Sequence, residues 1–162
     1  MALIMNYEDS LLPEGEYEMV IKSACENVTK GGTQHISIPM VVRNDVQQKF
    51  QNMYLWHTIW RAKNPTEQDR AFQGYLSKQL LRLCEVAGIP KGKQFNSLQE
   101  LLDELKGKPV RVTVFHEEYQ GQTSAKLKYL NPTKLPACRH TFQQAKQAIE
   151  MITEEDDLPF DV

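Results

Sequence analysis

The segment 53–60 contains the alternation that most restricts how this chain can fold. One parity is mostly aliphatic and the other mostly aromatic: Met53, Leu55, His57 and Ile59 alternate with Tyr54, Trp56, Thr58 and Trp60. Because successive side chains of a strand point to opposite faces, this pattern predicts a strand with an apolar inner face. Its aromatic face is either exposed to a ligand or packed under other elements, since aromatic residues are also good strand formers.

Four further segments show the same two-residue period. The apolar positions of these predicted strands are Tyr17, Met19 and Ile21; Ile36, Ile38, Met40 and Val42; Val110, Val112 and Val114; and Ala125, Leu127 and Tyr129. Turn-forming residues separate the segments, as in the Gly31–Gly32 pair and at Gly121. Pro39 removes one backbone donor from its strand and predicts an edge or a bulge there.

Helical spacing appears between the third and fourth predicted strands. A helix is expected to begin with Asn64 as N-cap and Pro65 at its first position, and to end at Gly88. Ser97 and Glu100 predict the start of a second helix that ends at Gly107. Three strands, a helical insert and two strands are the element order of the OB-fold. The expected fold is therefore all-β with a helical insert, a five-stranded OB-fold barrel with helices between strands 3 and 4.

The two signs of charge are distributed unevenly. Six of the 21 acidic residues lie within 150–162, which contains no Lys or Arg, whereas the preceding residues hold all 19 basic side chains. Four consecutive carboxylates at 154–157 repel one another, so this end is expected to be solvated. A purely solvating tail has no use for the short hydrophobe that follows. Its predicted partner-binding residues are Asp156, Asp157, Leu158, Pro159 and Phe160.

The run 156–160 resembles the acidic tip of bacterial single-stranded DNA-binding proteins, which ends in Asp-Asp-Ile-Pro-Phe. The whole chain resembles phage-encoded single-stranded DNA-binding proteins. This resemblance implies a non-catalytic, self-associating protein that coats DNA in replication or recombination and recruits DNA-processing partners through its tip. Two features depart from the bacterial pattern: Asp161 and Val162 follow Phe160, and a helix-like segment, 141–152, replaces a long linker.

We therefore expect an OB-fold DNA-binding domain at 1–137, a C-terminal helix at 138–153 and an acidic interaction tip at 154–162. Aromatic rings on an outer barrel face stack with unpaired bases, and spaced cations hold the phosphates. The predicted nucleic-acid-binding residues are Arg43, Lys49, Tyr54, Trp56, Trp60, Arg111, Phe115, Lys126 and Lys128. The alternative hypothesis is an OB-like interaction adaptor that binds no DNA and acts through its acidic motif alone.

Other classes of function have weaker support. The segment 88–94 is glycine-rich but lacks the spacing and the Ser or Thr of a phosphate-binding loop, and no motif predicts catalysis, a metal or another cofactor. The three cysteines form no C-x-x-C pair, which is typical of free thiols in a reducing cytoplasm. No apolar run approaches the ~18 residues of a membrane span, and the first residues do not resemble a signal peptide. A cytoplasmic location is expected, in the host cell if the protein is phage-encoded.

Overall fold

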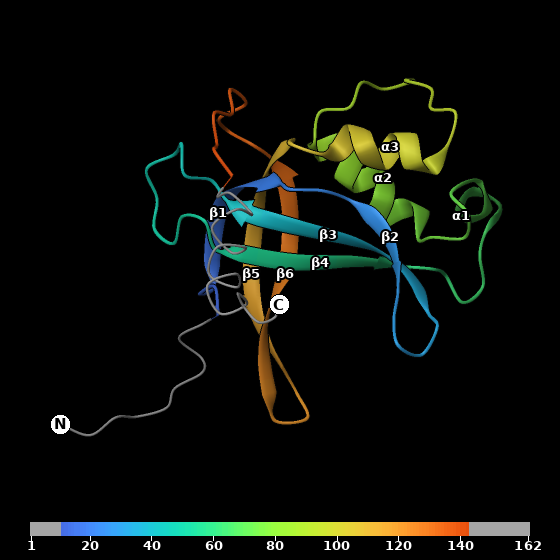
Figure 1. Ribbon diagram of the computed structural model, residues 1–162, viewed down its shortest axis with the longest axis horizontal. Helices are drawn as coiled ribbons and strands as arrows, with labels where there is room; N and C mark the ends of the chain where they lie inside the picture. Colours follow the sequence, from blue (N-terminus) through green and yellow to red (C-terminus); the bar gives the residue numbers. More distant parts are fainter. Residues whose placement is uncertain (1–10, 143–162) are drawn as a thin grey trace, which may run out of the picture.

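A computed structural model describes residues 11–142 and shows a six-stranded antiparallel sheet with three helices (Figure 1). The elements, in chain order, are β1 (Gly15–Ile21), β2 (Cys25–Val28), β3 (Gln34–Val42), β4 (Tyr54–Trp60), α1 (Glu67–Ala71), α2 (Ser77–Val86), α3 (Leu98–Leu105), β5 (Pro109–Tyr119) and β6 (Gln122–Pro132). The expected mostly-β fold with helical segments is confirmed. The tip at 154–162 and most of the expected C-terminal helix lie outside the described residues, and residues 138–142 are not helical.

Strand β3 organises the sheet because it pairs with three others. One edge pairs with β4 along seven residue pairs, from His35–Trp60 to Val41–Tyr54. The other edge pairs with β2 near its start and with β1 near its end. β1 and β2 thus follow each other along one edge of β3, and the far edge of β1 pairs with β5.

The expected closed barrel of five strands is wrong: the sheet has six strands and is open. Strands β4 and β6 approach within 8 Å between Cα atoms, yet no ladder joins them among the described residues. Helix α2 packs against β6 instead, and Arg82 Nη2 donates to the Leu130 carbonyl oxygen at 3.1 Å. This hydrogen bond ties α2 to β6.

The core lies between the inner face of the sheet and the helices. The apolar parities predicted for β1, β3 and β5 are buried, as are Leu55 and Ile59 of β4. Helices α2 and α3 cover one end of the sheet (Figure 1) and contribute Leu80, Leu83 and Leu102 to the same core. Burial of these side chains provides the main stabilisation, at about 1.5–3 kcal/mol for each large one.

The helix expected from residue 65 to residue 87 is interrupted. Thr66, not Asn64, is the N-cap of a short α1, and Asp69 completes its capping box. Gly74 then has φ +90°, and a Cβ there would lie 2.9 Å from Arg61 Nη2, so the chain turns where only glycine fits. The Asp69 carboxylate accepts from the Ser77 backbone N–H at 2.9 Å and fixes the start of α2. Residues 98–105 form α3, and Ser97 is its N-cap, as predicted.

Arg43 is fully buried, which corrects its predicted role as an outward-facing phosphate ligand. It follows the last residue of β3, where the strand parity no longer determines the direction of its side chain. The guanidinium donates to both Asp45 carboxylate oxygens at 2.9 and 2.7 Å. It also donates to the backbone carbonyls of Leu135 and Ala137, and lies 3.8 Å from Glu18. Arg43 therefore holds the chain after β6 against the β3–β4 loop, and this network of Arg43 with Asp45, Glu18 and the two carbonyls is here called the clamp.

We expect Arg43→Met to lower the free energy of unfolding by about 3–5 kcal/mol, because it leaves the largely buried side chains of Glu18 and Asp45 without their cation. Urea denaturation measures this change. Arg139→Met is the matched control, since Arg139 is exposed and contributes only its backbone N–H to the network. A loss below about 1 kcal/mol for Arg43→Met would show that the clamp is not a major source of stability.

The same clamp predicts a pH dependence of stability. Hydrogen bonds from Arg43 lower the pKa of Asp45 to about 2 from 3.8. The stabilisation is therefore complete above the ordinary pKa and is lost as the pH falls through about 2. We expect the stability advantage of the wild type over Asp45→Asn to shrink by on the order of 1 kcal/mol on acidification through this window, after allowance for solvent screening. Chemical denaturation of both proteins at several pH values measures it, and a constant difference would contradict the prediction.

Candidate nucleic-acid interface

The outer face of β4 displays three aromatic side chains, here called the aromatic shelf: Tyr54, Trp56 and Trp60. Their exposed fractions are 36%, 62% and 44%. They are exposed because Leu55 and Ile59, on the opposite parity, are buried in the core. The rings of Tyr54 and Trp56 stack with centroids 5.7 Å apart and an interplanar angle of 19°. The shelf therefore exposes aromatic ring surface to solvent, and such rings stack with bases of any sequence.

Two residues that the sequence did not single out complete the shelf. Lys22, just after β1, donates from Nζ to the Tyr54 hydroxyl at 2.9 Å and lies 5.1 Å from the centre of its ring. His35 of β3 lies opposite Trp60, with ring centroids 5.1 Å apart. The strand register, which places positions 35 and 60 side by side, is the signal that identifies His35. Lys22 is brought to Tyr54 because the end of β1 and the start of β4 pair with the same end of β3.

Strands β5 and β6 form a long hairpin, here called the arm, that projects beyond the rest of the sheet (Figure 1). Lys126 pairs with the half-buried Phe115, and Lys128 lies 5.4 Å above the ring of Tyr129. Both lysines are exposed. The arm therefore carries cations and aromatic rings next to each other, as a surface that holds a phosphate chain requires.

A register shift in the arm changes one prediction. The ladder shifts between Thr113 and Val114, so that Thr113 pairs with Tyr129 and Val114 pairs with Leu127. Lys128 is the extra residue of this bulge, and Tyr129 is 58% exposed instead of lying in the core. Such a bulge is difficult to recognise from the sequence, because apolar and polar residues alternate regularly on both sides of it. Tyr129 is thus a candidate stacking residue that sequence reasoning missed.

The predicted cations differ in how free they are to bind phosphate. Arg43 is held in the buried clamp, and Arg111 forms an ion pair with Glu16 and lies 4.0 Å from Glu18. Lys49 is exposed in the loop that leads into β4. The structure therefore places Lys22 and Lys128 beside exposed aromatic rings and Lys126 beside the half-buried Phe115. It keeps Lys49 at the surface and engages the two arginines in ion pairs.

His57 lies at the seam where β4 approaches β6. Burial lowers the pKa of its imidazole, and the positive charge of Lys126 on β6 lowers it further.

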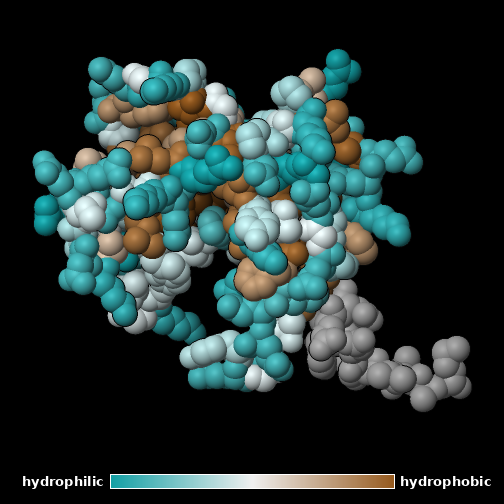
Figure 2. Space-filling model, turned by 180° about the vertical axis from the view of Figure 1, so that it is seen from behind, coloured by the Kyte–Doolittle hydropathy of each residue, from teal (hydrophilic) through white to brown (hydrophobic). Residues whose placement is uncertain are grey.

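The shelf and the arm share one face of the sheet. Paired residues of neighbouring strands point to the same face, so the registers put Tyr129 and Lys126 on the outer face that carries the shelf. In the space-filling view, a notch in the outline separates the β2–β3 hairpin from the tip of the arm (Figure 2).

Other kinds of site are not apparent in the described part of the chain. Within residues 11–142, no three His, Cys, Asp or Glu side chains are grouped as a metal site would need. None of the helices in this range has the length and hydropathy required to cross a bilayer. Its cysteines, Cys25, Cys84 and Cys138, are free thiols.

Comparison with known proteins identifies a family but no activity. Residues 5–146 match the model of a family described as a protein of unknown function, DUF669. No curated protein matches the chain. Because the matched residues make up most of the sequence, the chain belongs to the DUF669 family.

Proposed function

We propose that this protein binds single-stranded DNA without sequence preference and is not an enzyme. The observation that carries the proposal is the aromatic shelf. Tyr54 and Trp56 are stacked and open to solvent, and both tryptophans of the chain lie on this one face. Stacking on such rings contributes about 1–3 kcal/mol per base and depends little on base identity.

The arrangement of strands supports the same function. We propose that the sheet is an open variant of the OB-fold, in which β1 and β2 replace a single bent first strand. OB-folds bind oligonucleotides on the face of strands 2 and 3, between the loop after strand 1 and the loop between strands 4 and 5. The corresponding parts here are the β3–β4 face, the β2–β3 turn and the arm. These are the elements that carry the shelf and border the notch in Figure 2.

Phosphate contacts would come from the cations that are not committed elsewhere. Lys22 and Lys128 stand beside exposed rings, and Lys126 and Lys49 are exposed on β6 and before β4. Four such contacts on a single strand predict a slope of about −3 for the logarithm of affinity against the logarithm of salt concentration. Arg43 and Arg111 are not counted, because each is paired with carboxylates.

The biological setting is proposed from the resemblance of the chain. The protein would coat DNA as a homo-oligomer during phage replication or recombination, in the host cytoplasm, where its free thiols stay reduced. The tip residues Asp156–Phe160, which lie outside the described residues, would recruit DNA-processing proteins.

Tryptophan fluorescence tests the proposal directly. Poly(dT) should quench the emission strongly at low salt, and added salt should restore it with the slope given above. Duplex DNA of equal length should quench much less, because its bases are already stacked. Unchanged emission, together with no binding in an anisotropy assay with labelled dT oligomers, would instead support a protein-interaction adaptor.

Trp56→Ala should weaken dT binding by roughly 5- to 150-fold, the equivalent of about 1–3 kcal/mol of lost stacking. Its thermal stability should change little, because the side chain is 62% exposed. Leu135→Ala is the matched control for an exposed hydrophobic side chain, 47% exposed and outside the shelf. Equal affinities of Trp56→Ala and wild type would exclude the shelf as the binding surface.

A further inference from the structure

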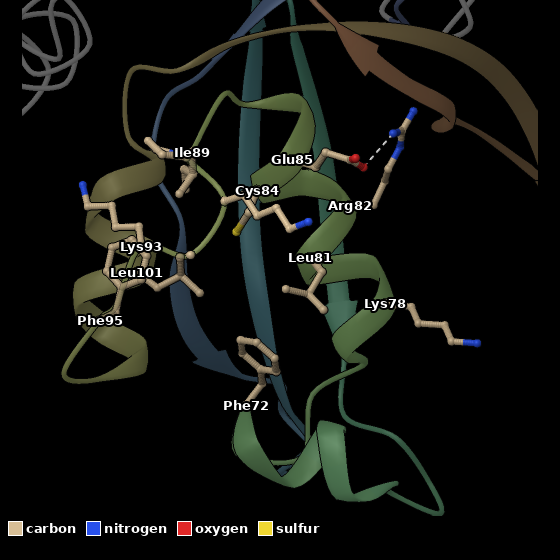
Figure 3. Close-up of a pocket in the computed structure, with 13 residues that line it drawn as sticks. Phe72, Lys78, Leu81, Arg82, Cys84, Glu85, Ile89, Lys93, Phe95 and Leu101 are labelled. Carbon is tan, nitrogen blue, oxygen red and sulfur yellow. Dashed lines mark hydrogen bonds and ion pairs between the residues drawn. The ribbon is translucent and has the colours of Figure 1, made fainter.

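An apolar groove of about 680 Å³ lies between α2 and the segment that leads into α3. Figure 3 shows Phe72, Leu81 and Leu101 directed toward its centre, with Ile89 and Phe95 on the side of α3. Leu81 is 39% exposed although it stands on a helix whose other leucines are buried. The groove has the size of a typical ligand site and no occupant among the described residues, so an apolar group could enter it without displacing the core.

The rim of this groove is positively charged. Lys78, Arg82, Lys91 and Lys93 line it, with Glu85 as the one acidic lining residue among those described. Arg82 pairs with Glu85 at 2.9 Å, and Lys93 with Glu104 at 3.2 Å. Lys78 and Lys91 form no ion pair within residues 11–142. The groove is thus suited to an apolar segment flanked by carboxylates.

The C-terminal segment of the chain has that composition. We propose that residues 154–160 dock in the α2–α3 groove of their own chain. Leu158 and Phe160 would fill the apolar floor, and the carboxylates of 154–157 would lie against the lysines of the rim. Pro159 restricts the backbone between the two hydrophobes, which lowers the entropy lost on docking.

The length of the chain permits this contact. The described residues end at Phe142, where Asn44 accepts from the Thr141 N–H at 3.1 Å and donates to its carbonyl at 2.7 Å. From there to Leu158 an extended chain reaches about 50 Å, at about 3.4 Å per residue. The radius of gyration of a domain of this size is about 14 Å, so the groove lies within reach. Tethering also gives the tip an effective concentration of the order of millimolar, enough to populate a weak contact.

Docking at this groove has a specific consequence. The groove is lined by α2, α3 and the chain between them, whereas the shelf lies on the outer face of β4, so the docked tip would not occupy the shelf. The rim residues Lys78 and Arg82 also border the arm near Lys128 and Tyr129. Docking would bury Leu158 and Phe160 until a partner protein that binds them more tightly displaces them from the groove. The inference is independent of DNA binding, and its test contains no DNA.

Photocrosslinking of the full-length protein tests the proposal. Phe160 is replaced by p-benzoylphenylalanine, the dilute protein is irradiated at low salt, and the crosslinked peptides are mapped by mass spectrometry. Crosslinks should fall on the groove residues between 72 and 101, within a protein of monomeric mass. Leu81→Asp, which puts a carboxylate on the apolar wall, should lower their yield by roughly tenfold. Lys91→Glu, which alters only the rim charge, should lower it several-fold.

Leu135→Asp is the matched control: it adds the same charge at an exposed leucine outside the groove and should leave the yield unchanged. Circular dichroism melts confirm that each variant is folded. Crosslinks on β4 would place the tip on the shelf and overturn the proposal. Products of dimeric mass alone would show docking between chains and also overturn it, as would a yield that Leu81→Asp does not alter.

Discussion

The burial of Leu55 and Ile59 is the constraint on which the rest of the structure depends. These two side chains are almost inaccessible to water, and their backbone pairs with β3 along the whole of β4. Successive side chains of a strand point to opposite faces, so the burial of Leu55 and Ile59 directs the other parity away from the core, and a shift of register by one residue would exchange the two faces. The core behind β4 therefore keeps its other side chains, Tyr54, Trp56 and Trp60, on the outer face. No additional structural element is needed to orient the shelf.

The helices and the clamp complete this arrangement. Helix α2 packs against β6 and leaves the sheet open at the β4–β6 seam, where buried His57 lies under the influence of Lys126. Arg43 ties the chain after β6 to the β3–β4 loop through Asp45 and two backbone carbonyls. Both features fix the position of the arm relative to β4. In the proposed function, a strand of DNA would then meet rings on β4 and lysines on β6 in a constant geometry.

Much of the fold could be predicted because it depends on the local alternation of apolar and polar side chains along each strand. The alternation of aliphatic residues located the inner faces of β1, β3, β4 and β5, and Ser97 marked the start of α3. The remainder depends on contacts between distant residues. Helix α1 ends at Ala71 and the chain turns at Gly74, beside the Arg61 side chain, while Arg82 bonds to Leu130 of β6.

The candidate site shows the same division. The alternation of β4 separated an aliphatic face from an aromatic one, but it left open whether the aromatic face is exposed, which the structure shows. The burial of Arg43 could not, because it lies beyond the last pair of β3 and its partners, Leu135 and Ala137, are far along the chain. The exposure of Tyr129 depends on a bulge in β6, and the contact of Lys22 with Tyr54 depends on the position of Lys22 just beyond the end of β1.

The most direct test of the central claim is a proton–nitrogen NMR titration that follows the two indole N–H signals as a dT oligomer is added. The account predicts that both signals, from Trp56 and Trp60, shift or broaden at low salt and return when salt is added; two stationary signals in the presence of excess oligomer would contradict it.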